Sequence, residues 1–146
     1  MTEPRWKERV RLRTVDPQKA LAGVRRGSRV FVGSGCAEPV LLVTALGERE
    51  DVADVEVLHI MTIGEAPYAR AAKAGRFRHN AFFIGSNVRE AVASGDADYT
   101  PVFLSEIPAL FRTRKLPIDV ALIVRVRREA ELHALAEPVV TLRAGR

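Results

Sequence analysis

The chain has 146 residues, of which 47% are hydrophobic and 28% are charged, and it carries a formal net charge of +5. This is the composition of a globular protein large enough to bury one core. A single cysteine, Cys36, excludes an intrachain disulfide and a cysteine-based zinc site. Without an apolar run of the ~18 residues that a membrane span needs, and with no apolar segment behind the basic N-terminal residues, a cytoplasmic protein is expected.

The basic charge raises the question of nucleic-acid binding. The arginines are spread along the chain and interleaved with acids, and neither a zinc-finger spacing nor an RNA-binding aromatic signature is present. These features argue against nucleic acid as a partner. An electropositive surface that attracts anionic, phosphate-bearing ligands is the milder expectation.

The first predicted helix begins at Pro17, with Asp16 as its N-cap, and ends at Gly27. Residues 29–32 form a short predicted strand that runs into a glycine-rich turn. The helix expected over 39–47 is apolar on nearly every side, so it should be buried.

The remaining predicted elements alternate between strands and helices. They are strands at 55–60, 77–83 and 118–124, and helical segments at 69–74, 88–93 and 105–111, with a loop over 96–101. Such alternation predicts an α/β fold with a mostly parallel sheet and helices on both faces. Residues 125–146, with a helix expected over 128–136 and a β-prone run at 139–142, do not join this pattern. We therefore divide the chain into an α/β domain, 1–124, and a C-terminal tail, 125–146.

The loop 33–39 lies where a strand hands over to a helix, the place where open parallel sheets hold ligands. Glycines there allow a close approach of the backbone, and a helix N-terminus favours anions. The loop lacks the third glycine of a dinucleotide fingerprint and the Gly-Lys-Ser/Thr of a P-loop. A tight turn without a ligand therefore stays open as an alternative.

Single residues allow functional and structural interpretations, and we favour the structural ones. Cys36 could be a nucleophile activated by a helix N-terminus, but a small buried cysteine is preferred. Glu38 could be a general base, but a first-turn acid that complements the helix dipole is preferred. His59 is interpreted as a core histidine, and Asp96 with Asp98 as turn residues. Neither His79 nor His133 has a partner at metal-ligand spacing, so no metal site is predicted.

Six stretches taken together resemble one family, the acetyl-CoA hydrolases and 4-hydroxybutyrate-type CoA-transferases. In chain order they are Phe-Val-Gly-Ser-Gly-Cys-Ala-Glu-Pro at 31–39, His59 with Gly-Glu-Ala-Pro-Tyr at 64–68, Phe-Phe-Ile-Gly-Ser-Asn-Val-Arg-Glu-Ala-Val at 82–92, Gly-Asp-Ala-Asp-Tyr-Thr-Pro at 95–101, Phe-Leu-Ser-Glu-Ile-Pro at 103–108 and Leu-Pro-Ile-Asp-Val-Ala-Leu-Ile at 116–123. The resemblance covers about 15–124.

The resemblance implies a doubly wound α/β fold that is repeated in a second domain, with the active site between the two. A glutamate of the second domain would attack a short-chain acyl-CoA such as acetyl-CoA, followed by transfer of CoA to a carboxylate or by hydrolysis. Coenzyme A would enter as the acyl-CoA substrate, and no metal is implied. This chain would contribute part of the substrate pocket and no catalytic residue. The substrate-binding residues that the resemblance implies are Gly33, Ser34, Gly35, Cys36, Ala37, Glu38, Asn87 and Arg89, with Arg89 suited to a substrate carboxylate.

The sequence departs from the family after Val124. The family continues with a Ser-Pro-Pro-Asp-type loop and a glycine-rich stretch, whereas this chain reads Arg-Val-Arg-Arg-Glu-Ala-Glu and has no glycine before Gly145. We therefore expect a frameshifted or truncated form that is inactive alone and that self-associates through an uncovered apolar face. The alternatives are a non-catalytic partner of a separately encoded C-terminal half and an anion- or nucleic-acid-binding module.

Overall fold

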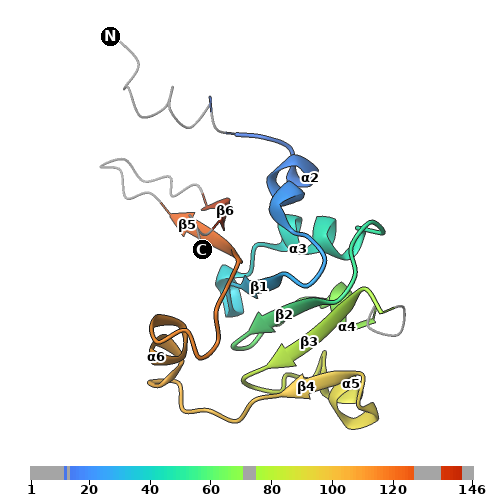
Figure 1. Ribbon diagram of the computed structural model, residues 1–146, viewed down its shortest axis with the longest axis vertical. Coiled ribbons are helices and arrows are strands. Elements are labelled where there is room, and N and C mark those ends of the chain that lie inside the picture. The colour runs from blue at the N-terminus through green and yellow to red at the C-terminus, as the bar shows by residue number, and fades with distance from the viewer. Residues whose placement is uncertain (1–11, 13, 71–74, 127–135, 143–146) are drawn as a thin grey trace.

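The computed structural model describes residues 12, 14–70, 75–126 and 136–142. A six-stranded sheet with the order β4-β3-β2-β1-β5-β6 organises them (Figure 1). Five strands are parallel, and β6 pairs antiparallel with β5. The strands are β1 (Arg29–Val32), β2 (Val55–His59), β3 (Phe77–Ala81), β4 (Ala97–Tyr99), β5 (Val120–Val126) and β6 (Ala136–Leu142).

Helices connect the parallel strands. The chain runs from β1 outward to β4 through α3 (Val40–Gly47), α4 (Pro67–Arg70) and α5 (Arg89–Ser94), and then returns through α6 (Ile107–Arg112) to β5 on the other side of β1. Because crossovers between parallel strands are right-handed, this change of direction places α6 on the opposite face of the sheet from the other three helices.

The two faces of β1 confirm the doubly wound arrangement. Val30 and Val32 are fully buried in the main core, where they pack with residues of β2, β5 and α3. Phe31 lies between them in the sequence and therefore points to the other face. There its ring centroid lies 5.4 Å from that of Phe111 in α6. The predicted α/β fold, with helices on both faces of a mostly parallel sheet, is thus confirmed.

The first helix begins as predicted but ends early. The Asp16 side chain accepts a hydrogen bond of 2.8 Å from the backbone N–H of Lys19 and caps α2 (Pro17–Ala20). A 3-10 turn, η1 (Leu21–Gly23), follows at once. The chain leaves the helix there because Leu21 and Val24 both enter the core, and Val24 does so with an extended backbone. Gly27, the predicted end, lies in the turn before β1 with a φ of 73°.

The expected burial of the helix over 39–47 is partly wrong. Leu42, Val43 and Leu46 enter the core, but Val40 and Leu41 are 62% and 59% exposed. The apolar sequence of α3 gives no sign of which side faces the core, so the helix has an exposed apolar end that sequence reasoning does not predict.

Sequence reasoning missed the strand β4 and predicted only the second half of β6, as the β-prone run at 139–142. The expected loop 96–101 contains β4, where Asp98 pairs with Arg78 of β3 instead of serving as a turn residue. Asp96 does lie in the turn after α5, where it accepts a hydrogen bond of 2.7 Å from Ser94 Oγ. In the C-terminal tail, β6 joins the sheet, and β5 continues to Val126. The helix expected over 128–136 lies outside the described residues except for Ala136, which begins β6.

None of the helices in the described ranges is both long enough and apolar enough to cross a membrane.

Candidate functional site

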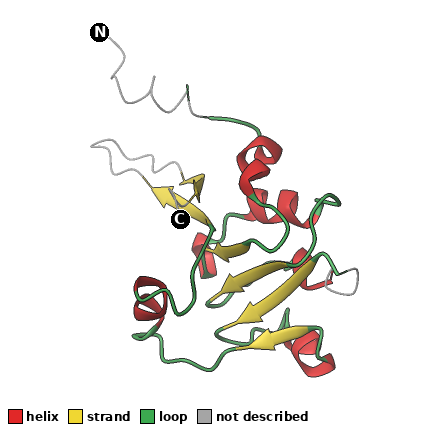
Figure 2. Ribbon diagram, in the orientation of Figure 1, coloured by secondary structure: helices red, strands yellow, loops and turns green. Residues whose placement is uncertain are grey.

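The loops 33–39, 60–66 and 82–88 follow three adjacent strands, β1, β2 and β3. All three begin where a parallel strand ends. They therefore lie next to one another at the carboxyl ends of the strands, beyond the arrowheads in Figure 2. The strand order also changes direction at β1, between β2 and β5. In open α/β sheets, ligands bind at such a point.

Loop 33–39 is shaped by close backbone contacts. The N–H of Gly33 donates to Leu122 O of β5 at 2.8 Å, and a Cβ at position 33 would lie 2.9 Å from Ala37 O. Gly35 begins a short 3-10 turn, η2 (Gly35–Ala37), with a φ of 60°. Both glycines are therefore required by the local backbone, whether or not a ligand binds.

Ser34 joins the first loop to the second. Its hydroxyl oxygen accepts a hydrogen bond of 3.2 Å from the backbone N–H of Ile60. In the other direction, the N–H of Gly35 donates to Met61 O at 2.9 Å. Bonds in both directions fix the two loops relative to each other.

Glu38 is buried and joins two loops, and it is not the first-turn acid of a helix that sequence analysis favours. Pro39 occupies the N-cap of α3, and the first turn of that helix contains no acid. The Glu38 carboxylate instead accepts a hydrogen bond of 3.1 Å from the backbone N–H of Gly64. A Cβ at Gly64 would lie only 2.8 Å from Glu38 Oε1, so the absent side chain at 64 is what admits the carboxylate.

Asn87 attaches the third loop to the second. Its side-chain nitrogen donates to Gly64 O at 2.7 Å and to Thr62 Oγ1 at 3.1 Å. Both amide hydrogens are therefore used inside the protein. Thr62, which is only 3% exposed, was not identified from the sequence. Gly64 belongs to one of the six stretches on which the resemblance rests, but it is not among the predicted site residues.

The expected burial of Cys36 is wrong. This cysteine is exposed, not buried, because it lies in the η2 turn at the tip of loop 33–39. Ala37 and Arg89 are exposed as well. Arg89 begins α5, and its side chain forms no hydrogen bond or ion pair within the part of the chain that the structure describes. Of the predicted residues, Cys36, Ala37 and Arg89 are thus the ones that a ligand can reach most directly.

Comparison with known protein families identifies the family to which the chain belongs. The family model of the acetyl-CoA hydrolase/transferase N-terminal domain matches residues 4–130. The chain belongs to this family. It is 41% identical over 119 residues to the 4-hydroxybutyrate coenzyme A transferase of Clostridium kluyveri, an alignment that covers 81% of this chain and 28% of that protein. It is 43% identical over 103 residues to a succinyl-CoA:acetate/propanoyl-CoA:succinate CoA transferase of Fasciola hepatica, covering 68% of this chain and 21% of that protein.

Solved structures share the fold of this hydrolase/transferase domain. RipA from Yersinia pestis superposes with a TM-score of 0.66 at 21% identity, covering 75% of this chain and 28% of RipA. A 4-hydroxybutyrate CoA-transferase from Porphyromonas gingivalis gives a TM-score of 0.60 at 24% identity, covering 82% of this chain and 26% of that one. The chain therefore spans little more than a quarter of these proteins.

His59, at the end of β2 in this domain, is a core histidine as predicted. It is fully buried, and its Nδ1 lies 2.9 Å from the hydroxyl of Tyr68. Burial, followed by the nearby His79, lowers the pKa of His59 to about 3. Burial likewise lowers the pKa of His79 to about 4. Both rings are neutral at physiological pH and out of reach of solvent, so neither is suited to proton transfer with a substrate.

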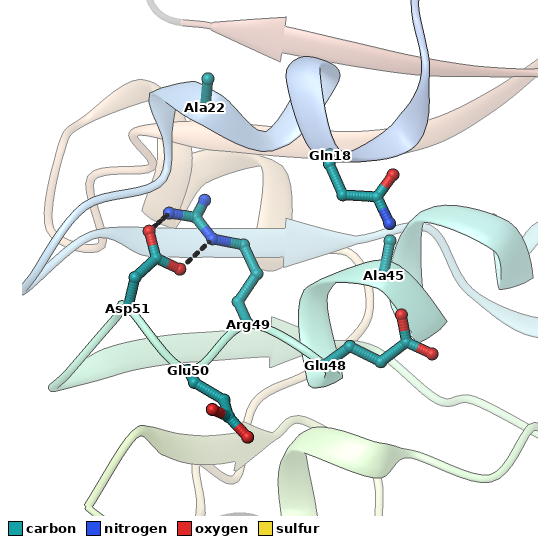
Figure 3. A pocket seen from close by; sticks show the side chains of 7 residues that line it. All are labelled: Gln18, Ala22, Ala45, Glu48, Arg49, Glu50 and Asp51. Carbon is teal, nitrogen blue, oxygen red and sulfur yellow. Dashed lines mark hydrogen bonds and ion pairs between the residues drawn. The ribbon is translucent and has the colours of Figure 1, made fainter.

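A hollow near the amino end of β2 contains none of the predicted site residues. It lies between α2, α3 and the loop that leads into β2, and Figure 3 shows its lining. Arg49 is bound there to Asp51 through Nε at 2.7 Å, while Glu48 and Glu50 add further negative charge. A net acidic lining disfavours an anionic ligand such as an acyl-CoA.

Proposed function

We propose that this domain forms the N-terminal side of a site that transfers CoA between carboxylic acids. The substrates would be a short-chain acyl-CoA, such as acetyl-CoA, and a carboxylate acceptor. The observation that carries the proposal is the joining of loops 33–39, 60–66 and 82–88 into one bonded surface, with exposed Arg89 beside it, in a chain of this family. Acetyl-CoA hydrolysis would follow when water replaces the acceptor.

In the proposed reaction, a glutamate from a second domain outside these 146 residues attacks the thioester carbonyl. CoA thiolate leaves, and a mixed anhydride forms between the glutamate and the acyl group. The thiolate then attacks the glutamyl carbonyl, which releases the first carboxylate and gives a glutamyl-CoA thioester. The acceptor carboxylate runs the same steps in reverse. Glu38 is not that nucleophile, because its carboxylate is buried and accepts the Gly64 N–H.

The contribution of this chain would be to orient the carboxylate and to exclude water from one side of the site. An arginine side chain can bind a carboxylate through two parallel hydrogen bonds, and Arg89 is exposed for such a contact. Exposed apolar residues of the neighbouring loops, Met61 and Ile63, would help to keep water away from the anhydride.

A chimaera tests the proposal. Residues 15–124 of this chain would replace the matching segment of the Clostridium kluyveri transferase, with which the chain shares 41% identity. The chimaera is expected to transfer CoA from acetyl-CoA to a carboxylate acceptor, and R89Q is expected to lower kcat/KM by about 10- to 100-fold, the loss of one charge-assisted contact. R112Q, which alters an exposed arginine of α6, is the matched control and should leave activity unchanged.

The isolated 146-residue chain is the second control, and it should release CoA from acetyl-CoA no faster than buffer does. A folded chimaera without transfer activity would refute the proposal, and so would equal activity losses for R89Q and R112Q.

A further inference from the structure

The three loops of the site meet on the backbone of one residue, Gly64. Glu38 of loop 33–39 accepts a hydrogen bond of 3.1 Å from the Gly64 N–H, and the side-chain nitrogen of Asn87 in loop 82–88 donates to the Gly64 carbonyl at 2.7 Å. The N–H and the carbonyl of one residue belong to successive peptide groups. The two side chains therefore fix the peptide groups on both sides of Gly64.

Two glycines leave room for these side chains. A Cβ at Gly64 would lie 2.8 Å from Glu38 Oε1, and a Cβ at Gly85 would lie 2.6 Å from Asn87 Oδ1. Neither glycine has a φ in the left-handed region, so both are needed for space and not for backbone conformation. A side chain at position 85 would therefore displace the Asn87 amide from its partners.

Asn87 makes these bonds in place of a helix cap. It directly precedes Val88, the N-cap of α5, and asparagine is among the residues that cap helices best. Val88 has no side chain that could cap the helix, but it is fully buried. A helix of six residues has little stability of its own. The start of α5, where Arg89 is the first residue, is therefore held by Val88 from the core and by Asn87 from the neighbouring loop.

We infer that Asn87 is a positioning residue: bound to Gly64, it holds the start of α5, and with it Arg89, in place beside loops 60–66 and 33–39. Both amide hydrogens of Asn87 are used inside the protein, on Gly64 O and Thr62 Oγ1, so they are not available to a ligand. Asn87 thus acts on a substrate only through Arg89, in place of the direct contact that the resemblance implies. Only this last step rests on the proposed function.

The isolated chain provides the first test, because it needs neither a variant nor a substrate. Solvent exchange of side-chain amide hydrogens is measured by NMR, with the exposed Gln18 as the internal reference. The amide hydrogens of Asn87 should exchange at least about tenfold more slowly than those of Gln18, because each must first leave its acceptor. Exchange of Asn87 as fast as that of Gln18 would overturn the inference.

The chimaera provides the second test, with the KM for the acceptor carboxylate as the readout. N87A should raise this KM by about tenfold, the order of magnitude of one or two lost hydrogen bonds, and change kcat little. In an R89Q background the same change should raise the KM by less than about twofold, because the residue through which Asn87 acts is already lost. S94A, which removes exposed hydrogen bonds at the other end of α5, is the matched control and should leave the KM unchanged.

An equal rise of the KM in both backgrounds would show a direct substrate contact and overturn the inference. An unchanged KM in N87A, with or without a loss of kcat, would also overturn it, since Arg89 would not depend on Asn87. If N87A does not fold, the exchange in the wild-type chain decides the matter. Because that exchange needs neither CoA nor transfer activity, its failure is distinguishable from failure of the chimaera.

Discussion

At the scale of single residues, the buried histidines make stability depend on pH. The pKa of His59 is lowered to about 3 and that of His79 to about 4, in both cases chiefly by burial. In the unfolded chain both return to about 6.5. Between these values the unfolded state binds more protons than the folded state, so folding stability is complete above about pH 6.5 and is lost as the pH falls toward 4.

The expected loss is at most about 1.4 kcal/mol per pH unit for each histidine. Urea denaturation at pH 7.5, 6.5, 5.5 and 4.5 measures it directly. The variant H79Q, which removes one of the two groups, should roughly halve the slope between pH 6 and pH 4.5. A free energy of unfolding that stays constant from pH 7.5 to pH 5 would show that the histidines are not buried as described.

Gly64 is the residue at which the second loop depends most on the absence of a side chain. A Cβ there would lie 2.8 Å from Glu38 Oε1, and the φ of Gly64 is not in the left-handed region, so an alanine would meet the carboxylate and displace it from the Gly64 N–H. G64A should therefore cost about 1–3 kcal/mol in the wild-type background. In an E38A background the same change should cost much less. Equal costs in both backgrounds, measured by urea denaturation, would mean that the two side chains do not meet.

The sequence indicates where such residues lie but not what they contact. The glycines and Glu38 of loop 33–39 were identified because they follow a strand and precede a helix. The partners Thr62 and Gly64 were missed because the bonds join positions about 25 residues apart, and no local pattern encodes such a pair. Cys36 was expected inside because cysteine is often buried, but the tip of a 3-10 turn places it outside.

At the scale of elements, the strands and helices with a strong local sequence pattern could be predicted, and those with a weak pattern could not. The predicted strands at 29–32, 55–60, 77–83 and 118–124, with helical segments between them, were enough to predict the parallel sheet. By contrast, β4 has only three residues, too few to show a period of two, and it forms because β3 offers an open edge. The β-prone run at 139–142 is confirmed as part of β6, but its sequence gives no sign of its partner: Pro138 and the charged stretch before it break the pattern, and the pairing follows from the open edge of β5.

The uniformly apolar helix α3 allows a direct test of which side faces the core. Leu41 is 59% exposed and the adjacent Leu42 is 3% exposed. L42A should destabilise the protein by about 2–5 kcal/mol, since it leaves a cavity in the core. L41A should change the free energy of unfolding by less than about 0.5 kcal/mol. Thermal and urea denaturation of the two variants measure the difference, and similar losses would indicate that α3 is rotated relative to its described orientation.

At the scale of the whole molecule, apolar side chains gather around the carboxyl edge of the sheet. Val40 and Leu41 follow loop 33–39, Met61 and Ile63 lie in the next loop, and Phe83 lies in the third, and each is at least 44% exposed. Hydrogen bonds hold these loops together, so their exposed apolar residues lie at the same end of the strands as the site, and we call them the apolar rim. A rim of this kind is typical of a surface that is covered by another domain or another chain.

We therefore expect the isolated chain to self-associate through this rim. Sedimentation equilibrium over a hundredfold range of concentration should show a weight-average mass that rises above 16.1 kDa. The variant I63D places a charge in the rim and should shift association to higher concentration, because burying an unpaired carboxylate at an interface is costly. V15D, which alters a half-exposed valine before α2 and away from the loops, is the matched control and should associate like the wild type. A chain that stays monomeric throughout, or one in which V15D and I63D weaken association equally, would contradict a role for the rim, and the site would then have to be complete without a covering surface.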